Sequence, residues 1–167
     1  VGLLGCYNSS VTKTVSIIAE KYEIPMITAL STSPTITKRG FNWFWRAVPH
    51  DDYSVLDLFN FLRALNEGKI RGVGKVPKEQ INTIAIAAEN TEFGSAVKKS
   101  IEEVSPNYGC QVVESLKYSH EAADLTSEVG RLIASKAKVY TFAPYISDAI
   151  MFVRNLKSLK ATPNIIW

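Results

Sequence analysis

The sequence has few of the residues that most often carry catalysis and metal binding. It contains two histidines and two cysteines among 167 residues, and neither histidine accompanies a nucleophile motif such as G-x-S-x-G. No Walker sequence occurs, and residues 72–74 (GVG) lack the strand-to-helix setting of a dinucleotide-binding loop. Two cysteines without clustered histidines also argue against a metal site. We therefore expect that the protein is not an enzyme and that it binds no cofactor and no metal.

Long apolar runs and a dominant charge are also missing. No run approaches the ~20 residues that cross a bilayer, and no charged segment followed by an apolar stretch opens the chain. The net charge of +3 comes from 19 basic and 16 acidic residues, which are spread along the chain and give no patch for nucleic acid. The sequence predicts a soluble segment, with any export signal removed or outside it.

The two cysteines leave three interpretations open. Cys6 and Cys110 form a disulfide, remain two thiols, or include one thiol whose partner lies outside this chain. Cys6 closes an apolar run, where a small buried thiol is the commoner case. We favour the interpretation of Cys6 as a small buried thiol.

The sequence is rich in short apolar runs that alternate with amphipathic segments, and 46% of its residues are hydrophobic. Strands are expected at residues 1–5, 24–30, 41–48, 81–88, 111–116, 139–142 and 165–167. Helices are expected from residue 9 or 10 to 23, from 51 or 52 to about 67, at 124–135 and at 147–159. A further helix is expected to start near 89–94 and to end at about 104. This alternation predicts an α/β fold with a mostly parallel sheet.

Two of the expected helices have specific caps and faces. The first has Ser9 or Ser10 as its N-cap, and the second has Asp51 or Asp52. Helical spacing in the first predicts one apolar face made of Val15, Ile18, Ala19 and Tyr22. In the second it predicts a face made of Val55, Leu58, Phe59, Leu62 and Leu65.

The chain divides near residue 49. Residues 1–48 supply two or three strands, which bury too little apolar surface to be stable alone. We expect them to form part of a first lobe, with an inter-lobe crossover at 49–52 and a nearly complete second lobe at 53–167. The partial lobe should expose a sheet edge that allows self-association.

Hydroxyl and aromatic residues follow four of the expected strands, where ligands bind in open parallel sheets. The pairs Ser9-Ser10 and Ser31-Thr32 combine hydroxyls with free helix amides, which suits a carboxylate. For Ser9 and Ser10, helix capping is the commoner role on sequence statistics alone, and the second pair has the composition of an ordinary turn.

Phe93 and Tyr145 offer aromatic faces for an aliphatic group or an ammonium. Phe93 is also suited to the core and Tyr145 to a half-exposed loop. With the hydroxyl pairs, the two rings describe an amino-acid-sized ligand.

Four segments together resemble the type I periplasmic binding proteins that serve branched-chain amino acid transporters. They are residues 5–12 (GCYNSSVT), 24–27 (IPMI) with 31–37 (STSPTIT), 44–51 (FWRAVPHD), and 93–94 (FG) after a strand. The resemblance covers essentially the whole chain and extends to amide- and urea-binding proteins and receptor ligand-binding domains. It implies type I α/β lobes joined by crossover segments, with the ligand enclosed between them.

The resemblance also implies roles for the first hydroxyl group. By position, Ser9 is similar to the residue that grips the ligand carboxylate, with Ser10 beside it as a further candidate contact. Ser31 is similar to a residue that contacts the ligand through its backbone. Thr32 is similar to one that contacts both the ammonium and the carboxylate.

The second lobe contributes aromatic contacts in the same comparison. Phe93 stands where family members often have a tyrosine, so the resemblance favours an apolar contact there. Tyr145 matches a loop that contacts the ligand. An acidic residue that binds the ammonium in several members would lie beyond Trp167.

The function implied by the resemblance is that of the extracytoplasmic solute-binding component of an ABC transporter. It would bind an amino acid or similar zwitterion without a cofactor, act in the periplasm or outside the cell, and deliver its ligand to a membrane permease. The alternative is a sensory or regulatory domain of the same fold that recognises an amide, urea or amino acid.

Overall fold

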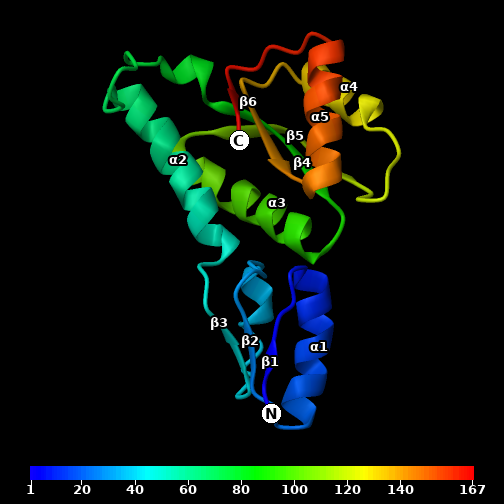
Figure 1. Cartoon of the computed structure of the whole chain (residues 1–167). Coiled ribbons are helices and arrows are strands. Elements are labelled where there is room, and N and C mark those ends of the chain that lie inside the picture. Colours follow the sequence, from blue (N-terminus) through cyan, green and yellow to red (C-terminus); the bar gives the residue numbers. More distant parts are fainter.

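The computed structural model describes all 167 residues and contains two separate β-sheets. The strand order is β1-β2-β3 in the first sheet and β5-β4-β6-β7 in the second, and every pair is parallel. Figure 1 shows the two sheets one above the other, with a narrow junction between them. The predicted α/β fold with parallel sheets is confirmed.

The first sheet consists of β1 (Leu3–Leu4), β2 (Met26–Thr28) and β3 (Phe44–Arg46). Helix α1 (Ser9–Lys21) joins β1 to β2, and a short 3₁₀ helix at Pro34–Ile36 lies between β2 and β3. We call residues 1–48 the small lobe and residues 53–167 the large lobe, following the division predicted above. That boundary stays a prediction.

The second sheet consists of β4 (Thr83–Glu89), β5 (Gln111–Tyr118), β6 (Val139–Ala143) and β7 (Ile165–Ile166). Its helices are α2 (Asp51–Glu67), α3 (Glu92–Val104), α4 (Thr126–Ala134) and α5 (Ile146–Ser158). Helices α2 and α3 cover one face of this sheet, and α4 and α5 cover the other (Figure 1). No helix is both long and apolar enough to cross a bilayer.

The large lobe has a core on each side of its sheet. In β4, Ile84 and Ile86 face α2 and α3, whereas Ala85 and Ala87 face α4 and α5, and all four are fully buried. A strand buried on both faces needs this continuous apolar run. The apolar face predicted for α2 is confirmed, because its five residues are all buried.

The apolar face predicted for α1 is confirmed for Ala19, which is in the small-lobe core, and for Val15, which packs against it, but is wrong for Ile18 and Tyr22. The buried residues of this helix are Ser9, Thr12, Ser16 and Ala19, whereas Ile18 is 52% exposed and Tyr22 is 62% exposed. The buried hydroxyls are satisfied inside the small lobe. Thr12 Oγ1 lies 2.5 Å from Ser31 Oγ, and Ser16 Oγ accepts a hydrogen bond of 2.6 Å from Arg39 Nη2.

The helix caps also differ by one residue or more from those expected. Asn8 is the N-cap of α1, and His50 is the N-cap of α2. Ser9 and Asp51 are therefore the first residues of their helices. Both residues line a common cavity at the junction between the lobes.

The first strand is exposed rather than buried. Leu4 is 89% exposed on β1, which lies at the edge of its sheet. Cys6 and Cys110 are free thiols in different lobes, so the structure contains no disulfide between them.

Candidate ligand-binding cleft

The two lobes face each other across a cavity of about 300 Å³. It lies beyond the carboxyl ends of β1, β2, β4 and β6, which is where open parallel sheets bind ligands. Its lining combines residues of both lobes: Tyr7, Ser9, Leu30, Thr32, Asp51, Phe93, Pro144 and Tyr145.

Four helices begin at this cavity. Ser9 and Asp51 are the first residues of α1 and α2, Phe93 is in the first turn of α3, and Tyr145 is the N-cap of α5. Figure 1 shows these helix ends converging on the junction. Unpaired amides and helix dipoles at N-termini stabilise a negative charge. The cavity therefore suits a ligand with an anionic group.

Ser9 and Thr32 form the hydroxyl side of the cavity. Ser9 is 3% exposed, and its Oγ accepts a hydrogen bond of 3.3 Å from the Ser33 amide. The Thr32 carbonyl accepts one of 3.0 Å from the Asp51 amide. The strand ends of the small lobe are thus fixed to each other and to the start of α2.

Ser10 and Ser31 are outside the cavity lining. The Ser31 hydroxyl is fully buried and donates toward the carbonyls of Cys6, at 2.8 Å, and Tyr7, at 3.0 Å. Ser10 Oγ accepts a hydrogen bond of 3.2 Å from the Glu92 amide. Both hydroxyls therefore have protein partners, which leaves only backbone contacts for a ligand at Ser31.

The aromatic side of the cavity centres on Tyr145. Its ring lies 5.9 Å from the ring of Phe93 and 6.4 Å from that of Tyr7, centroid to centroid. The Tyr145 hydroxyl lies 3.3 Å from Thr91 Oγ1, and its amide donates to Asp148 Oδ2 at 3.1 Å. These contacts hold the ring in place, so the predicted pair Phe93 and Tyr145 does share one wall.

Asp51 is the cavity residue of most chemical interest that the sequence analysis missed. Its side chain lines the cavity, it is 6% exposed, and its buried Oδ2 has no hydrogen-bond partner. Burial raises the pKa of Asp51 to about 6, against opposing effects of the Thr32 hydroxyl and the Arg46 guanidinium. A buried carboxylate oxygen without a donor is costly. A cationic or hydrogen-bond-donating ligand group would supply that donor.

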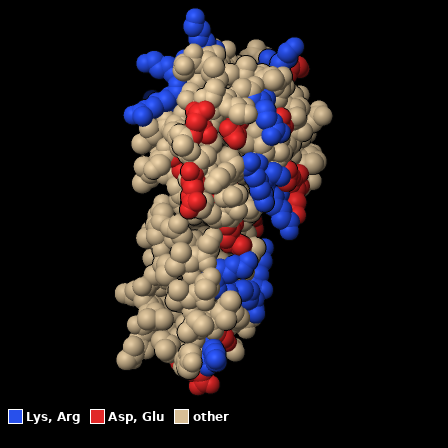
Figure 2. Space-filling view, turned by 90° about the vertical axis from the view of Figure 1, so that its right-hand side faces the viewer, with Lys and Arg blue, Asp and Glu red and all other residues tan.

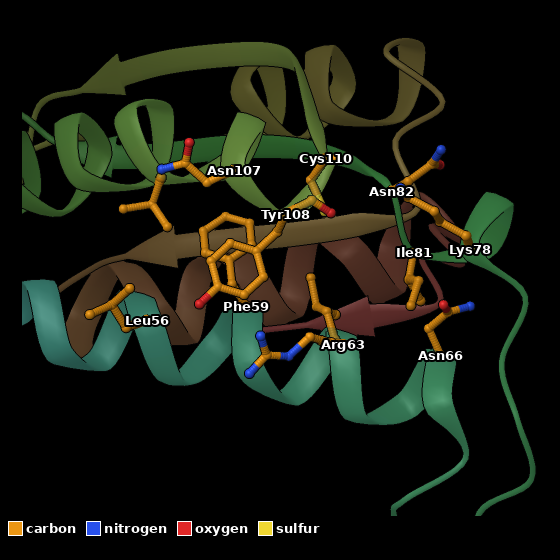
Figure 3. A pocket seen from close by; sticks show the side chains of 13 residues that line it. Leu56, Phe59, Arg63, Asn66, Lys78, Ile81, Asn82, Asn107, Tyr108 and Cys110 are labelled. Atoms are coloured by element: carbon orange, nitrogen blue, oxygen red, sulfur yellow. The ribbon is translucent and has the colours of Figure 1, made fainter.

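A second cavity, of about 750 Å³, lies at the other end of the large lobe. It is bounded by α2 and by residues 104–110, with Phe59 and Tyr108 stacked at 5.2 Å and Arg63 over the Tyr108 ring (Figure 3). Ile81 and Asn82, which also line it, precede β4. This cavity therefore adjoins the amino ends of the strands, away from the hydroxyl and carboxylate groups of the cleft.

No three histidine, cysteine or acidic side chains converge on a point that could hold a metal ion. The polar groups of the cleft are hydroxyls, amides and one carboxylate, a set that fits an organic zwitterion.

The family model described as "Periplasmic binding protein" matches residues 1–166. The chain belongs to the periplasmic binding protein family. This assignment agrees with the cleft, because the cavity lies between two lobes of parallel sheet.

Relatives of this periplasmic binding protein include Leu/Ile/Val-binding protein homolog 7 of Brucella suis, which is 25% identical over 166 residues. The match covers 99% of this chain and 40% of the relative. Metabotropic glutamate receptor 4 of Rattus norvegicus is 27% identical over 134 residues, which cover 80% of this chain and 13% of the receptor. The chain thus spans well under half the length of these relatives.

Among solved structures, an extracellular ligand-binding receptor from Rhodopseudomonas palustris HaA2 superposes with a TM-score of 0.81 at 17% identity. The match covers 98% of this chain and 42% of that receptor. An ABC transporter substrate-binding protein from Desulfitobacterium hafniense, in complex with Leu, gives a TM-score of 0.73 at 18% identity. The match covers 98% of this chain and 45% of that protein. These likenesses establish the type I fold. The relatives are named as binding proteins and receptors rather than as enzymes.

Proposed function

We propose that this periplasmic binding protein is the extracytoplasmic solute-binding component of an ABC transporter, with an amino acid or similar small zwitterion as its ligand. The observation that carries the proposal is a cavity at which four helices begin, lined by the hydroxyl residues Ser9 and Thr32 and by Asp51, whose buried Oδ2 has no partner. The positive helix ends suit a ligand carboxylate, and the carboxylate oxygen suits an ammonium.

The proposed contacts follow from this arrangement. Ser9 donates to the ligand carboxylate, Thr32 contacts both the carboxylate and the ammonium, and Asp51 accepts from the ammonium. The rings of Phe93 and Tyr145 pack against the remainder of the ligand. Ser31 contributes through its backbone, because its hydroxyl is already engaged, and Ser10 supports the cleft from outside the lining.

Binding would close the two lobes about the crossover at 49–52, since groups of both lobes meet only in the closed arrangement. A membrane permease would then recognise the closed form in the periplasm or at the cell exterior. The names of the solved relatives support this placement, as they include an ABC transporter substrate-binding protein and an extracellular ligand-binding receptor.

A sensory or regulatory ligand-binding domain is the second candidate, with an amide, urea or amino acid as ligand. The similarity to metabotropic glutamate receptor 4 favours it, because the matched segment covers 80% of this chain. Deletion of the gene distinguishes the two: loss of ligand uptake supports transport, and intact uptake with a lost response supports sensing.

The site is tested by a thermal-shift screen of amino acids and amides on the full-length protein, followed by calorimetric titration of the compound that stabilises most. Ser9→Ala or Thr32→Ala should each weaken binding by about 1–3 kcal/mol, the range for a charge-assisted hydrogen bond. Ser100→Ala is the matched control, since Ser100 is buried in α3 and lies outside the cavity lining.

Unchanged affinity in both cleft variants would overturn the assignment of Ser9 and Thr32. An equal loss in Ser100→Ala would show that the effect comes from the fold rather than from the site.

A further inference from the structure

Glu89, the last residue of β4, is an acidic residue without access to solvent. The acidic side chains visible in Figure 2 lie at the surface of the molecule, whereas Glu89 is fully buried. None of the ion pairs of the molecule includes it. A buried carboxylate needs hydrogen-bond donors in place of water, so its partners indicate what it does.

The carboxylate of Glu89 receives three hydrogen bonds from the segment that follows β4. Its Oε1 accepts one of 2.6 Å from the Gly94 amide and one of 2.8 Å from Thr91 Oγ1. Its Oε2 accepts from the Thr91 amide. Phe93, which lines the cleft, lies between these two partners in the sequence. Glu89 therefore fixes the backbone on both sides of Phe93 without lining the cavity itself.

The Thr91 hydroxyl extends these contacts to Tyr145. A threonine hydroxyl has one proton, and a carboxylate has none to give. The proton of Thr91 Oγ1 is therefore directed at Glu89, and Tyr145 is the donor in the 3.3 Å contact between its hydroxyl and Thr91 Oγ1. All three residues lie in the large lobe. This order of donors is consequently independent of how the two lobes are placed.

The order of donors decides what the Tyr145 hydroxyl offers to the cleft. Tyr145 lines the cavity, and burial raises the pKa of its phenol, which keeps its proton at neutral pH. That single proton is directed at Thr91. Only acceptor capacity is left on the phenol oxygen for a group inside the cavity. An ammonium or an amide N–H would supply a proton there, whereas a carboxylate would place an acceptor against an acceptor.

We propose that Glu89 is a positioning residue that, through Thr91, orients the Tyr145 hydroxyl so that it accepts from the ligand and does not donate to it. The proposal deepens the proposed function, on which it rests for the role of the cleft. A ligand group at this hydroxyl is then a hydrogen-bond donor. The helix N-termini remain the place for the ligand carboxylate.

The test follows the Tyr145 hydroxyl proton by NMR in the full-length protein without added ligand. Tyrosine labelled with carbon-13 at Cζ reports each hydroxyl in mixed H₂O and D₂O, because a slowly exchanging hydroxyl gives separate signals for its two isotopes. Tyr145→Phe assigns the signal. The Tyr145 proton should exchange about tenfold more slowly than that of Tyr53, which is 56% exposed.

Two variants at Thr91 test the contact with Tyr145. Thr91→Val removes the acceptor and should raise the exchange rate of the Tyr145 proton about tenfold, as expected for one lost hydrogen bond. Thr91→Ser keeps a hydroxyl and should preserve slow exchange. Thr126→Val is the matched control, because it removes another 2.8 Å hydrogen bond from a threonine to a carboxylate, that of Asp124, in the same lobe.

Glu89→Met tests the positioning residue itself. Methionine is of similar length but accepts no proton from Thr91, whose hydroxyl is then free to donate to Tyr145. The Tyr145 proton would turn from Thr91 and should exchange about tenfold faster. The Tyr118 hydroxyl, which donates to Asp148 at 2.8 Å in the core of the large lobe, is the internal reference for the fold and should stay slow.

The proposal is overturned when the wild-type Tyr145 proton exchanges as fast as that of Tyr53. It is also overturned when Thr91→Val or Glu89→Met leaves the rate unchanged. An equal rise in Thr126→Val, or an equal rise at Tyr118, would contradict it as well, because the change would then come from the fold. No ligand is present, so each result leaves the proposed function to its own test.

Discussion

The substitution Asp51→Asn should make the protein more stable at neutral pH. Burial raises the pKa of Asp51 from the ordinary value of 3.8 to about 6. The folded protein thus holds this proton more tightly than the unfolded chain does. The difference corresponds to a stabilising contribution of about 3 kcal/mol in acid, which is lost when the carboxyl ionises. Asparagine has no charge to bury.

The size of the effect depends on pH. The contribution of protonated Asp51 is fully present below pH 3.8 and is lost as the pH rises through about 6. The variant should therefore match the wild type at pH 3.5 and exceed it by up to about 3 kcal/mol at pH 7.5. Urea denaturation at both pH values measures the two free energies of unfolding.

Asp52→Asn is the matched control. Asp52 is the next residue, but its side chain is 32% exposed and lies 3.4 Å from His50 Nδ1 and 3.7 Å from Lys38 Nζ. Its substitution should bring no gain at pH 7.5. An equal change in the free energy of unfolding of Asp51→Asn at both pH values would contradict this prediction, since the effect would then not arise from ionisation.

Three further predictions concern the fold. Gly94→Ala should lower the melting temperature measured by calorimetry, because a Cβ there would lie 2.8 Å from the Glu89 backbone nitrogen. Relieving this clash should lower the free energy of unfolding by about 1–3 kcal/mol. Tyr118→Phe removes a buried hydrogen bond of 2.8 Å to Asp148 and should cost about 1–3 kcal/mol in urea denaturation, with an unchanged value contradicting the bond. Leu4→Lys, on the exposed edge strand, should reduce the self-association predicted for this chain, as measured by sedimentation; equal association would place the contact elsewhere.

Much of the fold could be predicted from the sequence because most helices bury apolar side chains at regular spacing. In α2, Val55 and Leu62 lie on the buried face that this spacing indicates. Helix α1 follows the rule only at Val15 and Ala19, because the rest of its buried face is made of hydroxyls. Two of their partners, Ser31 and Arg39, lie 19 and 23 residues away in sequence, and no local pattern reveals these contacts.

The candidate site could be predicted in part for a similar reason. Ser9, Thr32, Phe93 and Tyr145 follow strand ends, so the rule for parallel sheets brings them together. The sequence places Asp51 at the helix start, where an acidic residue has an ordinary role beside the dipole. Only the three-dimensional structure shows that its oxygen is buried and lacks a donor.

We propose that the cleft holds a zwitterion, with its carboxylate at Ser9 and Thr32 and its ammonium at Asp51. Calorimetric titration of the full-length protein tests it most directly, using amino acids and, for each, the analogue without the carboxylate and the analogue without the ammonium. We predict that at least one amino acid binds and that removal of either charge weakens binding about tenfold or more. Binding of no amino acid, or equal affinity for a singly charged analogue, would contradict the claim.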